Sequence, residues 1–345
     1  MLRLLEEASV KKRKIVFIDD VPLVGCIAFG LIDRGTNVIQ VRPSSACVLS
    51  CIFCSTDAGP KSKHRLCEYI VDLESLIEWF EYVVDYKGRK HIEAHIDTVG
   101  DPLTYPHIVE LVQKLSEIRG VEVISMQTHG ALLTERLVDE LADAGLSRIN
   151  LSIDALDPLL AKKLADTEWY DLERVLQVAE HIAERPDIDL LIAPVWVPGL
   201  NDQEIPKIIE YAIKIGAGKK WPPLGIQKYE AHKRGRKPRG VKPMTWRHFY
   251  RKLLELENKY KVKLILRPED FGIHKRPMLP IIYKKGEKVL VEVIEDGWLK
   301  GELLAVDKRR MRLITVIGVH ASPGTRMYVR IISNKHNLYI AEPTV

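Results

Sequence analysis

The hydrophobic positions of the chain follow two different periods, which change near residue 280. From residue 37 to about 265, short apolar runs alternate with segments in which apolar residues recur every three or four positions, as in strands followed by amphipathic helices. Because each parallel strand must return through a helix, this repeat predicts an α/β fold with a parallel sheet, curved into a partial (β/α)6 barrel. The expected strands are 37–42, 92–98, 121–128, 148–154, 189–197 and 224–229.

The second pattern begins after the segment HKRPMLP, where Pro277 and Pro280 interrupt any continuing element. From there, apolar and polar positions alternate between Asp-Gly, Asp-Lys-Arg-Arg and Ser-Pro-Gly turns, which predicts a small all-β barrel of five strands. Before the first repeat, a β-rich segment has a turn at Asp33-Arg34-Gly35. The chain is therefore expected to have an N-terminal β extension (1–36), a catalytic domain (37–275) and a C-terminal β-barrel (281–345).

Composition limits the classes of protein to consider. The 345 residues are 46% hydrophobic and 29% charged, and no apolar run reaches the roughly 18 residues needed to span a bilayer. Three of the five cysteines cluster within one short segment, so the chain lacks the spread, even framework of disulfide-stapled secreted proteins. We therefore expect a cytoplasmic protein without a membrane partner.

The clustered cysteines, Cys47, Cys51 and Cys54, follow the first predicted strand directly, where the loops of a parallel sheet converge. One interpretation is a zinc site completed by His64 or Cys67, although zinc sites usually draw their second pair of ligands from a separate segment. The other is a four-iron cluster, in which three cysteines leave one iron open to a further ligand.

The stretch CVLSCIFC on this loop, followed by the βα repeat, resembles the signature of the radical S-adenosylmethionine (SAM) superfamily. The resemblance implies a radical SAM barrel whose [4Fe-4S] cluster is held by the three cysteines. It further implies that SAM binds the open iron and that an electron, supplied by a donor partner, cleaves SAM to a 5′-deoxyadenosyl radical.

The same resemblance implies SAM-binding residues on the neighbouring loops. Gly100-Asp101-Pro102 stands where the family has Gly-Gly-Glu-Pro, and here a shorter carboxylate replaces the glutamate. Ser152 and Asp154 are further candidates. A structural role explains each equally well, as a cap at the end of the strand for Ser152 and as a helix N-cap for Asp154. His129 is a further loop candidate for contact with SAM or substrate. The implied SAM-binding set is Phe53, Gly100, Asp101, Pro102, Gln127, Ser152 and Asp154.

Basic charge gathers after the sixth predicted strand, which would place it at the mouth of the barrel. Residues 228–251 contain nine Lys or Arg against Glu230 alone, interleaved with Tyr229 and Trp246. A solvated face explains many such runs, but basic and aromatic side chains beside a catalytic opening also suit phosphate contact and base stacking. The predicted RNA-binding residues in this segment are Lys233, Arg234, Arg236, Lys237 and Arg239.

The C-terminal segment resembles the TRAM domain, a small β-barrel appended to RNA-modifying enzymes. It contains a second basic cluster, Lys308, Arg309, Arg310 and Arg312, which is expected to contact a phosphate backbone. The alternative is a barrel that only packs on the catalytic domain. No cysteine follows Cys67, which disfavours methylation through a methyl-carrying cysteine.

Together these features predict a radical SAM enzyme that modifies a base in tRNA or rRNA. Two other interpretations stay open: a radical SAM enzyme acting on a protein or small metabolite, and a zinc-containing RNA-binding protein without catalysis. The sequence does not select the base, the reaction type or the oligomeric state.

Overall fold

A six-stranded sheet in the order β2-β3-β5-β6-β7-β8 forms the centre of the protein, seen in a computed structural model that describes residues 13–344. All its neighbouring strands run parallel except β2, which pairs antiparallel with β3 at one edge. The turn at Asp33-Arg34-Gly35 joins these two strands, so β2 extends the main sheet. The strands are β2 (Gly30–Asp33), β3 (Val38–Arg42), β5 (Ile92–Ile96), β6 (Val121–Thr128), β7 (Arg148–Leu151) and β8 (Asp189–Ile192).

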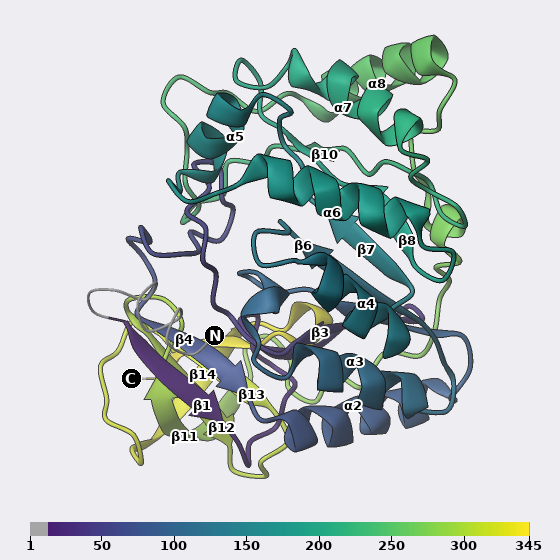
Figure 1. Cartoon of the computed structure of the whole chain (residues 1–345). Helices are drawn as coiled ribbons and strands as arrows, with labels where there is room; N and C mark the ends of the chain where they lie inside the picture. The colour runs from purple at the N-terminus through teal and green to yellow at the C-terminus, as the bar shows by residue number, and fades with distance from the viewer. Residues whose placement is uncertain (1–12, 345) are drawn as a thin grey trace.

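Amphipathic helices connect the strands and cover one face of the sheet, with α2, α3, α4 and α6 forming a layer in Figure 1. In α4, the Thr134 side chain accepts a hydrogen bond from the Leu137 amide and caps the first turn, while Val138 and Leu141 are buried. The helices are α2 (Leu73–Lys87), α3 (Ile108–Glu117), α4 (Glu135–Asp143), α5 (Pro158–Ala165), α6 (Leu172–Glu184), α7 (Glu204–Lys214) and α8 (Trp246–Tyr260), with short 3-10 turns η1 (Pro102–Thr104), η2 (Pro268–Phe271) and η3 (Lys335–Asn337).

The sixth strand of the predicted repeat is short. Leu224 forms an isolated bridge with Ile192 at the end of β8, and β10 (Gln227–Lys228) pairs only with β9 (Val195–Trp196). The sheet therefore curves into a partial barrel, as predicted, and β10 leads directly into the basic segment.

Residues 288–343 form a closed five-stranded barrel in the order β11-β12-β13-β15-β14, which confirms the predicted all-β C-terminal unit. It has its own hydrophobic core, which includes Val293, Ile314 and Ile331. Its strands are β11 (Lys288–Asp296), β12 (Glu302–Asp307), β13 (Leu313–Ile317), β14 (Arg326–Ser333) and β15 (Ile340–Pro343).

The C-terminal barrel is joined to the rest of the protein through main-chain hydrogen bonds. The amides of Leu66 and Leu313 donate to the carbonyls of Trp298 and Val24, each at 2.9 Å. At Gly25 the two segments of the chain lie so close that a Cβ atom on this residue would be 2.0 Å from the Leu313 carbonyl oxygen. The parallel pair β1 (Lys14–Ile18) and β4 (Cys67–Val71) lies beside the barrel in Figure 1.

No helix among residues 13–344 is long and apolar enough to cross a membrane.

Candidate active site

A cavity of about 440 Å³ lies where the loops after the parallel strands meet. Cys47, Cys51 and Cys54 all line it, and no disulfide involves any of them. Four of the residues predicted to bind SAM line the same cavity: Phe53, Gly100, Gln127 and Ser152. The geometry therefore brings together loops as far apart in the sequence as those of Cys47 and His232.

The cysteine loop is fixed mainly by backbone contacts. The amides of Ser50 and Ile52 donate to the carbonyls of Ala165 and Leu164 at the end of α5, at 3.1 and 2.9 Å. The loop after β5 packs directly against the start of the cysteine loop. A Cβ atom on Gly100 would lie 1.9 Å from the Ala46 carbonyl oxygen, so only glycine allows this close approach.

The cysteine side chains have the chemistry that an iron–sulfur cluster requires. Burial raises the pKa of the Cys47 and Cys51 thiols, so both are neutral without metal, and binding iron must displace their protons. No group of three or more His, Cys, Asp or Glu side chains in the described part of the chain is arranged to hold a single metal ion. In a four-iron cluster each cysteine binds a different iron, so the three sulfurs need not meet at one point.

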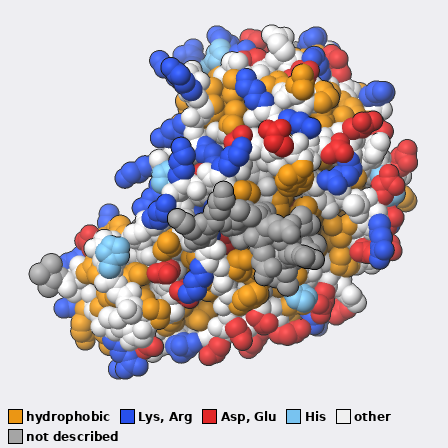
Figure 2. Space-filling model, turned by 60° about the vertical axis from the view of Figure 1, so that its left-hand side comes forward, with side chains coloured by type: hydrophobic (Ala, Val, Ile, Leu, Met, Phe, Trp, Pro, Cys, Tyr) orange, Lys and Arg blue, Asp and Glu red, His pale blue; other side chains and the backbone are white. Residues whose placement is uncertain are grey.

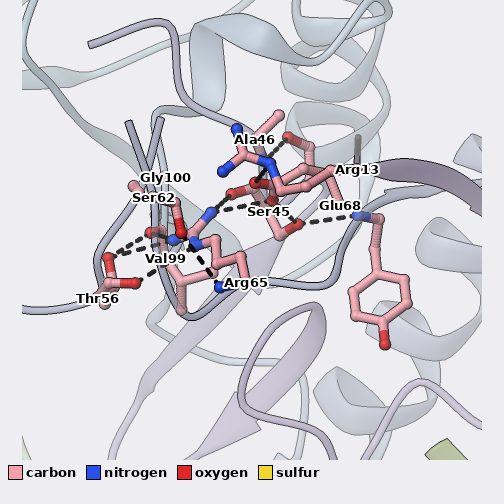
Figure 3. A network of polar contacts seen from close by, with 12 residues as sticks. Arg13, Ser45, Ala46, Thr56, Ser62, Arg65, Glu68, Val99 and Gly100 are labelled. Atoms are coloured by element: carbon pink, nitrogen blue, oxygen red, sulfur yellow. Dashed lines mark hydrogen bonds and ion pairs between the residues drawn. The ribbon is translucent and has the colours of Figure 1, made fainter. Parts of the chain in front are cut away.

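Arg65 connects the cysteine loop with the walls of the cavity (Figure 3). Its buried guanidinium donates to the carbonyl of Ser45 at 2.6 Å, to the carbonyl of Val99 and to the Glu68 carboxylate at 2.9 Å. It also donates to the Thr56 hydroxyl at 3.3 Å. The side chain thus joins both ends of the cysteine loop to the loop after β5, a role that its position in the sequence did not indicate.

Arg236, predicted to contact RNA, instead holds the cysteine loop from the other side. Its side chain is 15% exposed, and it donates to the Cys51 carbonyl at 2.8 Å and to the carboxylate of Asp57 at 2.9 Å. Its main-chain amide donates to the Cys54 carbonyl at 2.8 Å. The guanidinium is therefore occupied by the protein and is not free for a phosphate.

Three of the predicted SAM-binding residues lie outside the cavity lining. The Asp101 carboxylate accepts hydrogen bonds from the Thr128 hydroxyl at 2.9 Å and from the His129 amide at 3.0 Å, which ties the loop after β5 to the end of β6. Asp154 is enclosed and accepts from the Val195 amide at 2.7 Å, and burial raises its pKa. Pro102 is buried in η1.

The remaining candidates for RNA contact differ in exposure. Lys233, Arg234, Lys237 and Arg239 are exposed. In the C-terminal barrel Lys308, Arg309 and Arg310 are exposed, whereas Arg312 is buried and donates to the carbonyls of Met311 and Pro280. The second basic cluster therefore presents three cationic side chains at the surface.

Sequence reasoning missed four polar residues that line the cavity: His95, Asp97, Thr98 and Gln227. Lys228, Glu230 and His232, which also line it, belong to the segment predicted at its mouth. One signal was available, because alternate residues of a strand face the same side. In β5, Ala94 and Ile96 are fully buried in the hydrophobic core, and by this alternation Glu93 and His95, together with Asp97 just after the strand, face the other side.

Comparisons with known proteins agree with this geometry. Residues 41–212 match the model of the Radical SAM superfamily. An uncharacterised protein of Methanocaldococcus jannaschii is 44% identical, over 97% of this chain and 82% of that protein. The chain belongs to the radical SAM superfamily. As a radical SAM enzyme it uses a [4Fe-4S] cluster and SAM.

More distant relatives cover only part of the chain. A GTP 3′,8-cyclase of Chlorobaculum tepidum is 29% identical over 51% of this chain, which spans about half, 50%, of the cyclase's length. Among solved structures, HydG, a maturase of the [FeFe]-hydrogenase, has a TM-score of 0.50 at 14% identity, covering 78% of this chain and 56% of HydG. The latter similarity shows the radical SAM fold alone.

The radical SAM cofactors fit the residues of the cavity. Cys47, Cys51 and Cys54 would hold the cluster, and the polar and apolar side chains around them leave room for a second ligand. When bound, the cluster supplies the electron that cleaves SAM to a 5′-deoxyadenosyl radical and methionine. The protein's part is to orient the reactants and to exclude water from them.

Proposed function

We propose that this radical SAM enzyme modifies a base in RNA, tRNA or rRNA. The observation that carries the proposal is the course of the segment after β10. Gln227 to Glu230 and His232 line the cavity beside the cysteines, and the residues that follow are exposed and basic. A polyanion bound to those cations would lie next to the place where the radical forms.

Exposed aromatic rings adjoin the basic segment and suit the bases of such a ligand. Trp246 and Tyr250 at the start of α8 are 55% and 46% exposed, and their rings stack with centroids 5.7 Å apart. The Lys228 ammonium lies 4.9 Å from the centre of the Trp246 ring, although this side chain is buried and pairs with Glu230, so the cations available to a ligand are the exposed ones that follow it. A stacked aromatic surface beside cations is typical of proteins that bind single-stranded RNA.

The C-terminal barrel extends the same surface in this proposal. Arg234 of the basic segment forms an ion pair with Glu302 of β12, so the two regions are in direct contact. Lys and Arg side chains gather along the left edge of the face shown in Figure 2, whereas Asp and Glu gather along its right and lower edges. We propose that the barrel acts as a TRAM-like RNA-binding domain, with Lys308, Arg309 and Arg310 contacting phosphates.

The test is an anaerobic assay of the reconstituted enzyme with SAM and a reductant. 5′-Deoxyadenosine is quantified with and without total small RNA from the source organism, and Cys51→Ala gives the background without cluster chemistry. RNA-dependent release, followed by detection of a new nucleoside by mass spectrometry, would support the proposal. Release that is independent of RNA, with no new nucleoside, would overturn it.

A second candidate is a free purine nucleotide as substrate. It is favoured by the similarity between the radical SAM half of this chain and GTP 3′,8-cyclases. The same assay separates the two, because GTP and other nucleoside triphosphates replace RNA in a parallel set of reactions. Stimulation by a free nucleotide but not by RNA would favour this candidate.

A further inference from the structure

His95 occupies a position inside the barrel that the radical SAM chemistry leaves unassigned. It lies on β5, directly opposite Ser125 of β6 in the parallel register, and it lines the cavity that contains the cysteines. The imidazole Nδ1 is 2.7 Å from the Ser125 hydroxyl oxygen. Because the ring is held by its neighbouring strand, its second nitrogen has a fixed direction.

The proton on this ring can be assigned from the hydrogen bonds. The Ser125 hydroxyl has one proton, and it donates it to the Glu93 carboxylate at 2.6 Å. Arg148 donates to the same carboxylate oxygen at 2.7 Å and keeps that carboxylate an acceptor. The Ser125 oxygen must therefore accept from His95, so Nδ1 bears the proton and Nε2 has the free lone pair.

Within residues 13–344, no group forms a hydrogen bond with Nε2 of His95. Nε2 is also not one of the buried polar atoms that lack a partner, so it is exposed to the cavity that His95 lines. Burial is the largest influence on His95 and lowers its pKa, with Arg148 and Arg42 acting in the same direction against Asp97 and Glu93. The imidazole is therefore neutral at neutral pH.

Asp97, a carboxylate that follows the same strand, is already bound by other side chains of the protein. Asp97 also lines the cavity, but Arg42 donates to both of its oxygens at 3.1 and 2.9 Å, and Gln40 donates at 2.8 Å. Its charge is compensated by Arg42, and three donors of the protein already occupy its two oxygens. His95 thus presents a neutral acceptor next to a carboxylate that is compensated within the protein.

We infer that His95 Nε2 is a substrate-binding acceptor that takes a hydrogen bond from an N–H or O–H group of the substrate in the cavity. The chain from Arg148 through Glu93 and Ser125 positions the ring, so these three are positioning residues. The inference rests on the proposed function only in taking this cavity as the substrate site. It applies equally to an RNA base and to a free nucleotide.

The two amide variants of His95 separate its two nitrogens. His95→Asn keeps a group near Nδ1 that can donate to Ser125 and removes the acceptor toward the cavity. His95→Gln places an amide oxygen near Nε2 and loses the Ser125 contact. The control is His91→Asn, because His91 precedes the same strand but is exposed and pairs with Glu122.

The first measurement is the tautomer of His95, read from two-bond ¹H–¹⁵N correlations of the imidazole ring in the full-length protein and assigned by its loss in His95→Asn. A neutral ring with the proton on Nδ1 is expected, and it should become a mixture of tautomers in Ser125→Ala. A proton on Nε2 would overturn the proposal, and this measurement needs neither substrate nor turnover.

The second measurement is substrate-dependent product formation at equal cluster content. We expect His95→Asn to lose roughly tenfold to a hundredfold, the usual effect of leaving a buried donor unpaired, while His95→Gln recovers part of the loss and His91→Asn matches the wild type. Full turnover in His95→Asn would overturn the proposal. If RNA fails as substrate but a nucleotide succeeds, the proposed function falls while both measurements on His95 still apply.

Discussion

The guanidinium carbon of Arg65 lies 4.8 Å from the centre of the Trp298 indole ring, so the side chain that braces the cysteine loop also packs on the C-terminal barrel. Trp298 lies between β11 and β12, and its carbonyl accepts the Leu66 amide next to Arg65 in the sequence. The barrel is thus in contact with the environment of the cluster ligands through one buried cation.

Replacing Arg65 by Met should destabilise the protein strongly. The change removes the buried guanidinium from Glu68 and from the Ser45 carbonyl. Because Glu68 keeps the Ser45 hydroxyl and Arg13 as partners, the expected loss is about 3 kcal/mol, the low end for breaking a buried ion pair. Denaturant unfolding of the purified protein measures the loss. Arg136→Met is the control, since the ion pair of Arg136 with Glu140 is exposed and its loss should leave stability unchanged. Equal stability of the two variants would contradict the role given to Arg65.

Substitutions of Arg236 and of its neighbour Lys237 should differ in their effect on the iron–sulfur content of the protein. Because Arg236 binds the carbonyl of Cys51, Arg236→Met should weaken iron binding by roughly tenfold to a hundredfold, as is usual for partners that orient metal ligands. Lys237 is exposed, so Lys237→Met should retain the full cluster. Iron and sulfide per chain after reconstitution measure both. Normal cluster content in Arg236→Met would show that the cysteine loop holds its shape without this contact.

The exposed basic residues at the cavity mouth should set the salt dependence of RNA binding. In the variant with Lys233, Lys237 and Arg239 all changed to Gln, the slope of log affinity against log salt should become shallower by about two, since each phosphate contact on single strands contributes about 0.7. In the control variant, Lys90 and Arg119 are changed to Gln. These two residues are exposed and lie before β5 and β6, at the ends of the strands away from the cavity. Titrations of a labelled small RNA at several salt concentrations test this, and an unchanged slope would remove the basic segment from the RNA surface.

Cys26 should make the protein less stable as the pH rises into the alkaline range. Burial raises the pKa of this thiol from 9.0 to about 11, so the fold favours the neutral form. The stabilisation is complete below the unfolded pKa of about 9 and is lost as pH rises toward 11, a change of about 2–3 kcal/mol. Cys26→Ala should start less stable and show a flatter decline. The difference in the free energy of unfolding between the two proteins, measured against pH, tests this, and parallel curves would disprove it.

The sequence was most informative where function follows from local spacing. The three cysteines and the strand ends near Gly100, Gln127 and Ser152 were predicted from short patterns, and the structure places all of them around one cavity. The alternation of apolar and polar residues likewise predicted both the βα repeat and the five-stranded barrel. These features depend on residues close together in the chain.

The sequence was less informative where a residue's partner lies far away in the chain. Arg236 and Arg312 look alike in a basic run, but one binds the cysteine loop and the other is buried against Pro280, because strand register and loop path decide which side is solvent. The contacts of Arg65 span residues 45 to 298, a separation that no local pattern encodes. His95 became a candidate only when its strand was placed beside Ser125.

The main-chain hydrogen bonds from Leu66 and Leu313 across to Trp298 and Val24 bear on how a target is chosen. A binding domain on a flexible linker searches a volume and can deliver many positions of its ligand to one catalytic centre. Here main-chain hydrogen bonds join the barrel to Val24 and to Leu66, which is next to the Arg65 that contacts the cysteine loop. A nucleic acid bound to the barrel would therefore reach the cavity at a fixed distance from its binding site. The enzyme would select the modified position by its distance, along the nucleic acid, from the part that the barrel binds.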